Sequence, residues 1–207
     1  MSQQFVIAPE TIIQAYTLGI FPMAAGRNAE KIHFFQPDIR GIIPLRDPKI
    51  PKKLQRLLRK QTFDIQWNKD FPAVIDGCAA PRSNTNDTWI NPMIRRLYIS
   101  LHKLGFAHSV EVYQQGKLMG GLYGVAIGGA FFGESMFSRV SNASKIALCH
   151  LMARLKYGNF KLLDAQFVND HLLQFGIEPI EKKAFQKKLE DAISCDANLK
   201  LDVPESI

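Results

Sequence analysis

The chain has 207 residues, of which 46% are hydrophobic and 22% are charged, so it can form one large or two small globular domains with a core. This balance excludes a disordered chain and a collagen-like chain. Lys and Arg number 26 against 19 Asp and Glu, and the formal net charge of +7 indicates a polyanionic partner or an anionic surface.

No apolar stretch reaches the ~20 residues that a membrane-spanning helix needs, and residues 1–10 lack the pattern of a signal peptide. We therefore expect a cytoplasmic protein that does not act at a membrane. The three cysteines, Cys78, Cys149 and Cys195, and the five histidines show no spacing typical of a disulfide framework or a zinc site. The sequence thus predicts no structural disulfide and no metal.

The first part of the chain predicts a small α+β unit. Residues 9–18 have helical spacing and end at Gly19, a typical residue after the end of a helix. Strand-like pieces and a second helix follow, at residues 32–35, 41–44, 51–60 and 63–67. We place the end of this N-terminal domain at residue 68, so that residues 69–207 form a second domain.

The second helix carries most of the net charge. Between residues 46 and 60 there are seven cationic side chains and one acidic side chain, which gives this segment a charge of +6. Lys52, Arg56 and Arg59 recur at i, i+4 and i+7 and share one face, opposite a stripe of leucines. Such a face is usually only solvated, but a helix without interleaved acids repels itself. We interpret the row as a site for nucleic-acid phosphates, in DNA or in RNA.

The second domain predicts helices, then a β-meander, then further helices. Two helical stretches and a strand come first, and residues 118–137 form a glycine-laced pair of strands that turns at Gly128. A buried helix begins at Ser141 or Asn142, because its apolar residues cover much of its circumference. A strand over residues 160–166 follows, and two helices close the chain.

Polar side chains interrupt apolar strands of this domain at two places. Glu134 lies between Phe132 and Met136, and a buried carboxylate needs a partner such as a substrate ammonium. Asp164 and Gln166 are two residues apart in the predicted strand, so we expect their side chains on one face. Ordinary core packing explains each apolar residue near these positions. An Asp and a Gln on one face among leucines are less often found in a purely structural role.

Other kinds of catalytic site find no support in the sequence. The glycines lie within strands rather than between a strand and a helix, which argues against a dinucleotide or P-loop site. No Ser-His-Asp or Cys-His order is visible, so nothing predicts a covalent intermediate on the protein. We therefore expect no cofactor.

Eight motifs closely resemble those of the leucyl/phenylalanyl-tRNA–protein transferase family, in order, between about residues 9 and 176. They are A-Y-T-L-G-I-F-P-M (15–23), F-F-Q-P-D-I-R (34–40), D-T-W-I (87–90), L-G-F-A-H-S-V-E-V (104–112), G-G-L-Y-G-V-A (120–126), F-F-G-E-S-M-F-S-R (131–139), N-A-S-K (142–145) and L-D-A-Q-F-V-N-D-H (163–171). The resemblance implies an α+β fold, with the small N-terminal domain followed by a GNAT-like acyltransferase domain.

The resemblance also implies an activity. Members of the family move leucine or phenylalanine, with methionine as a further candidate donor, from aminoacyl-tRNA to proteins with an N-terminal Arg or Lys. The product carries a signal for degradation. The implied partners are Leu-tRNA, Phe-tRNA and such a protein or peptide, and we expect a monomer.

Site residues follow from the motifs, position by position. The family's proposed catalytic pair falls on Asp164 and Gln166, and its basic tRNA-binding positions fall on Lys52, Arg56 and Arg59. The positions implied to bind the aminoacyl group or the terminal adenosine are Glu134, Leu122, Phe131, Gly133, Leu148, Leu151, Leu155, Leu163 and Trp89. The chain departs from the family where F-P-M and F-F-Q-P-D-I-R replace the common F-P-W and W-W-S-P-D-P-R.

An aminoacyl ester is already activated, so its aminolysis needs alignment and a free amine rather than ATP or a metal. We expect Gln166 to accept a hydrogen bond from the attacking amine, while Asp164 polarises Gln166. The alternatives are an acyl-CoA-dependent N-acetyltransferase of the same fold and a non-enzymatic RNA-binding module. The first lacks a convincing pyrophosphate-binding turn, and the second would not need Asp164 and Gln166.

Overall fold

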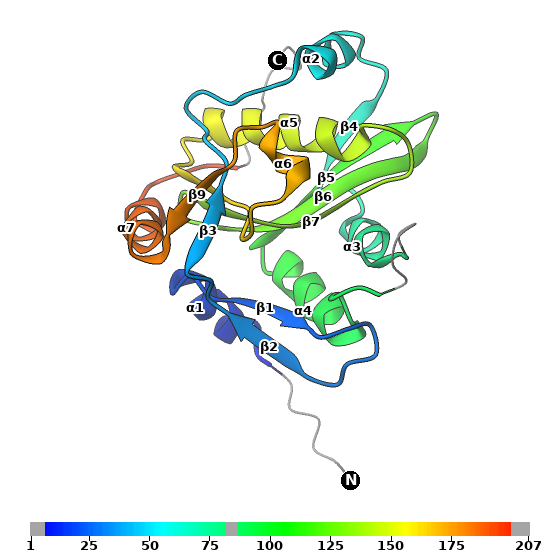
Figure 1. Ribbon diagram of the computed structural model, residues 1–207. Helices are drawn as coiled ribbons and strands as arrows, with labels where there is room; N and C mark the ends of the chain where they lie inside the picture. Colours follow the sequence, from blue (N-terminus) through cyan, green and yellow to red (C-terminus); the bar gives the residue numbers. More distant parts are fainter. Residues whose placement is uncertain (1–6, 82–86, 200–207) are drawn as a thin grey trace.

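The computed structural model describes residues 7–81 and 87–199. Its centre is a seven-stranded sheet with helices on both faces, and a two-stranded sheet lies beside it (Figure 1). The strands are β1 (Phe21–Ala24), β2 (Ile32–Phe35), β3 (Ile39–Ile42), β4 (Asp64–Trp67), β5 (Ala107–Gln114), β6 (Lys117–Ile127), β7 (Ala130–Ser138), β8 (Leu162–Asp164) and β9 (Glu178–Glu181). The helices are α1 (Pro9–Thr17), α2 (Lys52–Arg59), α3 (Phe71–Ala79), α4 (Pro92–Lys103), α5 (Ala143–Tyr157), α6 (Asp170–Leu173) and α7 (Lys182–Ile193).

The large sheet has the strand order β4-β5-β6-β7-β8-β3-β9. Neighbouring strands are antiparallel except for β7 and β8, which are parallel. The predicted meander of β5, β6 and β7 is confirmed, with Gly116 and Gly128 at positive φ in its two turns. Glycine adopts this backbone conformation without a steric cost, so these residues allow the short connections.

Two strands of the large sheet, β3 and β4, come from the first 68 residues of the chain. β4 pairs with β5 at one edge, and β3 lies between β8 and β9 near the other edge. The predicted α+β class is thus realised as one mixed sheet to which both parts of the chain contribute. The division of the chain at residue 68 stays a prediction.

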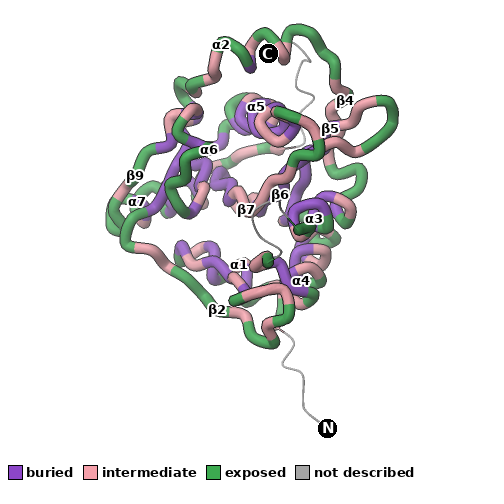
Figure 2. The backbone as a smooth tube through the Cα atoms, turned by 45° about the vertical axis from the view of Figure 1, so that its right-hand side comes forward, coloured by how far each residue is buried: buried purple, intermediate pink, exposed green. Residues whose placement is uncertain are grey.

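The helices cover both faces of the sheet. Helix α5 lies across one face, and α1, α3 and α4 lie on the opposite side (Figure 1). The burial colours of Figure 2 agree with the predicted buried character of α5, whose apolar residues pack against β5, β6 and β7. Within residues 7–81 and 87–199, none of these helices is both long enough and apolar enough to cross a membrane.

The predicted basic helix is confirmed as α2, which lies outside α5 (Figure 1). Leu54 is buried, and Leu57 and Leu58 are half-buried, so the leucine stripe faces the protein. The cationic side chains of α2 are exposed. The amphipathic pattern therefore places the charge on the outer surface.

β7 and β8 separate after three paired residues. The pairing runs from Ala130 opposite Leu162 to Phe132 opposite Asp164, and β8 then ends while β7 continues to Ser138. The predicted strand over residues 160–166 is therefore too long. Beyond Phe132, the edge of β7 that faced β8 has no β8 partner.

Candidate active site

A cavity of about 920 Å³ lies where β7 and β8 separate. One wall is apolar and consists of side chains from β6, α5 and β8: Leu122, Leu148, Leu151 and Leu163. Another wall carries the polar side chains Glu134, Asp164 and Gln166, and Gly133 and Trp89 also line the space. The fold thus brings together residues that the sequence motifs place far apart in the chain.

Two residues implied for the aminoacyl pocket do not line this cavity. Phe131 and Leu155 are fully buried and absent from its described lining. They belong to the same apolar cluster as Leu122 and Leu148. Their position behind the apolar wall is consistent with supporting its shape rather than touching a bound group.

Asp164 is held by an arginine that the sequence analysis did not single out. Arg40 Nε lies 2.9 Å from Asp164 Oδ1 and Arg40 Nη2 lies 2.7 Å from Oδ2, so the ion pair is bidentate. Arg40 also donates from Nη1 to the carbonyl of Gly19, and its guanidinium stacks over Phe21 and Phe185. Both members of the pair are buried, with 1% and 0% side-chain exposure.

Gln166 follows the end of β8 and has a left-handed backbone, with φ of 56°. Its amide nitrogen donates to Asp164 Oδ1 at 3.0 Å, while its side-chain Nε2 donates to Glu134 Oε1 at 3.0 Å. The expectation that Asp164 and Gln166 share one face of a strand is wrong, because the strand ends at Asp164. Asp164 instead accepts a hydrogen bond from the Gln166 backbone amide, which holds this non-glycine residue at a positive φ that is uncommon for it.

Glu134 is aimed by a β-bulge. In the pairing of β6 with β7, Tyr123 lies opposite Ser135 and Gly124 lies opposite Gly133, so Glu134 is the extra residue. A bulge re-aims a side chain and often lies next to an active site. This residue interrupts the apolar pattern of the strand because it is the bulged position.

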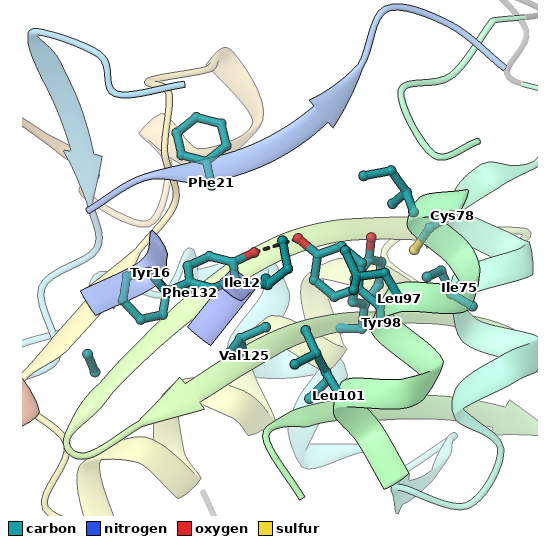
Figure 3. Close-up of a cluster of buried hydrophobic side chains, with 14 of the residues drawn as sticks. Ile12, Tyr16, Phe21, Ile75, Cys78, Leu97, Tyr98, Leu101, Val125 and Phe132 are labelled. Carbon is teal, nitrogen blue, oxygen red and sulfur yellow. Dashed lines mark hydrogen bonds between the residues drawn. The ribbon is translucent and has the colours of Figure 1, made fainter. Parts of the chain in front are cut away.

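Two buried tyrosines hold the Glu134 carboxyl. Tyr16 donates to Oε1 at 2.6 Å and Tyr98 donates to Oε2 at 2.8 Å, and the two hydroxyls are themselves 2.5 Å apart (Figure 3). Each phenol has one proton, and the two protons are directed at the two oxygens of the Glu134 carboxyl group.

The surroundings of Glu134 shift the pKa of its carboxyl group upward. Burial raises its pKa from 4.5 to about 7, although the hydrogen bonds from Tyr16 and Tyr98 lower it. Asp164 raises the pKa further and Arg40 lowers it. Burial also raises the pKa of both tyrosines well above 10, so they remain neutral donors.

The sequence gives weak signals for these partners. Tyr16 and Tyr98 occupy apolar positions on α1 and α4, and both belong to the core cluster, so their helices predict core packing. Arg40 lies in β3, whereas the predicted strand began one residue later, at Gly41. Starting that strand at Ile39 would have placed an arginine inside it, and a buried arginine requires a partner.

The chain matches known protein families along most of its length. The family model described as leucyl/phenylalanyl-tRNA protein transferase matches residues 42–190, and the model of that family's N-terminal domain matches residues 6–38. A leucyl/phenylalanyl-tRNA–protein transferase of Rhodopseudomonas palustris (strain TIE-1) is 50% identical over 201 residues, which cover 96% of this chain and 89% of the relative. The transferase of Paramagnetospirillum magneticum is 48% identical over 188 residues, covering 91% and 90%.

Among solved structures, the chain is similar to the crystal structure of FemX. The TM-score is 0.54 at 11% identity, and the match covers 83% of this chain and 66% of FemX. At this identity the likeness concerns the fold alone. It agrees with the predicted α+β class and with a GNAT-like arrangement.

Proposed function

The chain belongs to the leucyl/phenylalanyl-tRNA–protein transferase family and is an aminoacyl-tRNA–protein transferase, and from this premise we propose its acceptor and its chemistry. The acceptor is the α-amine of a protein or peptide that begins with Arg or Lys. Leucine or phenylalanine is added to it, which marks the protein for degradation. We place this reaction in the cytoplasm.

One observation carries the proposal: a single cavity combines an apolar wall with a carboxyl group that forms no ion pair with any of the described residues. The leucine side chains Leu122, Leu148, Leu151 and Leu163 suit the side chain of the donor amino acid. Of the two acids that line the cavity, Asp164 is neutralised by Arg40. Glu134 is bonded to neutral groups, so it remains to bind the ammonium of a substrate.

The proposed reaction is the aminolysis of an ester. The acceptor α-ammonium, with a reference pKa near ~8, first loses one proton. Its nitrogen then attacks the carbonyl carbon of the aminoacyl ester and gives up a second proton. The bond from that carbon to the tRNA ribose oxygen breaks, and this oxygen takes up a proton, so the second step is neutral overall. Binding both substrates in one cavity supplies most of the required alignment.

Glu134 is the proton acceptor in this scheme. The Glu134 carboxyl group, with its pKa raised to about 7, suits a general base that works near neutral pH. The neutral amide of Gln166 is a much weaker base. Gln166 donates to Glu134 through Nε2, which leaves its side-chain oxygen to accept a hydrogen bond from the attacking amine. Asp164 fixes the backbone of Gln166 and thereby the direction of that oxygen.

Changes in the predicted catalytic pair should slow the chemical step. We expect Asp164→Asn and Gln166→Glu each to lower the single-turnover rate about tenfold or more, because each change removes a hydrogen bond or a charge from the cavity. Thermal unfolding of both variants shows whether the fold is retained. Wild-type rates in both variants would contradict the assigned roles.

Labelled transfer tests the proposed acceptor. Leu-tRNA and Phe-tRNA carrying labelled amino acids are incubated with the protein and with peptides that begin with Arg, Lys, Asp or Ala. We expect label only on the peptides beginning with Arg or Lys, because their cationic groups fit an anionic site. Label on none of the peptides would overturn the proposal, and label on the Asp peptide alone would assign a different acceptor class.

The basic row of α2 is proposed to bind the tRNA. Replacing Lys52, Arg56 and Arg59 by glutamine should weaken tRNA binding and lower the slope of log affinity against log salt by about 3, at roughly 0.9 for each lost phosphate contact. Transfer from a minimal aminoacyl-adenosine donor should stay near the wild-type rate. Equal losses with both donors would mean that the row is structural.

A further inference from the structure

A second cavity, of about 490 Å³, separates α2 from the start of α5. Four cations line it, Lys53, Arg56, Lys60 and Lys145, and no acidic side chain is present in its described lining. We call this space the basic groove. Its α2 residues recur at i, i+3 and i+7, so they form a face that is adjacent to the row of Lys52, Arg56 and Arg59 and shares Arg56 with it.

The basic groove adjoins the candidate active site. Asn142 and Lys145 line both cavities, so the two cavities are neighbours at the first turn of α5. The ion pairs of Arg40 with Asp164 and of Arg95 with Asp76 include no cation of the basic groove. Four uncompensated cations around one concave surface repel each other, and a bound anion relieves this repulsion.

We propose that Lys145 and the groove-facing cations of α2 bind the phosphodiester groups of the single-stranded 3′ end of the donor tRNA and lead that end into the active site. This inference rests on the proposed function, in which the reacting ester is attached to the 3′-terminal nucleotide. The ester must enter the cavity while the rest of the polyanion stays outside. A cationic passage without acids suits a chain that carries one negative charge for each nucleotide.

Lys145→Gln tests the junction, with Lys156→Gln as the matched control. Lys156 is an exposed lysine in the last turn of the same helix and lines neither cavity. We expect Lys145→Gln to lower transfer from aminoacyl-tRNA about tenfold and to reduce the salt slope by about 0.7, the value for one single-strand phosphate. Lys156→Gln should change neither, and aminoacyl-adenosine should be used equally by both variants.

Direct binding separates the basic groove from the outer row without relying on transfer. The double variants Lys53→Gln/Lys60→Gln and Lys52→Gln/Arg59→Gln remove the same charge from two neighbouring faces. Both double variants should bind deacylated tRNA more weakly than the wild-type protein does. With tRNA that lacks its single-stranded 3′ nucleotides, the groove variant and Lys145→Gln should bind as tightly as the wild type, while the outer-row variant still binds weakly.

Three results would overturn the proposal: equal losses for Lys145→Gln and Lys156→Gln, equal losses of Lys145→Gln with both donors, or weak binding of the groove variant to the shortened tRNA. A protein that transfers from neither donor would contradict the proposed function instead. The binding measurements would still decide the role of the basic groove in that case.

Discussion

Glu134→Gln should lower the single-turnover rate of transfer by about a hundredfold or more, the usual contribution of a positioned general base. Glutamine keeps the size of the side chain, and its single oxygen can accept from one of the two tyrosines while its NH2 group donates to the other, but it cannot take a proton from the amine. The wild-type rate should rise with pH through about 7, where the Glu134 carboxyl ionises. The variant should lack this rise and show only the titration of the substrate amine.

Protein stability gives an independent readout of the same carboxyl group. Because the folded state raises the pKa of Glu134 from 4.5 to about 7, its contribution to the free energy of unfolding is fully present below pH 4.5. That contribution is lost as the pH rises through about 7. The melting temperature of the wild type should therefore fall, relative to Glu134→Gln, between pH 5 and pH 8. If Glu134→Gln transferred at the wild-type rate and with the wild-type pH profile, Glu134 would not be the proton acceptor.

Periodicity and charge in the sequence were enough to predict the elements that depend on neighbouring residues. Helix α2 follows from a leucine stripe and a cation row, and the meander follows from alternation with glycine turns. Glu134 stood out because a carboxyl group inside an apolar strand is costly. These patterns depend on residues close together in the sequence, so the predictions made from them held in the folded structure.

The contacts that complete the site are not local. Arg40 and Asp164 are 124 residues apart in the chain, and Tyr16 and Glu134 are 118 residues apart. Nothing in the amphipathic pattern of α1 distinguishes a tyrosine that only fills the core from one that also donates to a carboxyl group. The end of β8 at Asp164 was equally hidden, because a left-handed backbone at Gln166 stops an otherwise regular strand pattern.

Arg40→Met should lower the free energy of unfolding by about 3–5 kcal/mol, the usual cost of leaving one charge of a buried pair unpaired. Methionine keeps much of the arginine stem but lacks the guanidinium, so Asp164 loses its partner and the contacts of that group with Phe21 and Phe185 are lost too. The donor to the Gly19 carbonyl is lost as well. Chemical denaturation at constant pH measures the change.

The exposed pair of Arg95 and Asp76 is the matched control. It also has two guanidinium contacts to one carboxylate, but its side chains are 38% and 52% exposed. Arg95→Met should therefore cost about 0–1 kcal/mol. Adding Asp164→Asn to Arg40→Met should recover part of the lost stability, because it removes the unpaired charge while Asn can still accept from the Gln166 amide. If Arg40→Met costs no more than Arg95→Met, the buried pair does not hold Asp164 in place, and the direction of Gln166 must depend on other contacts.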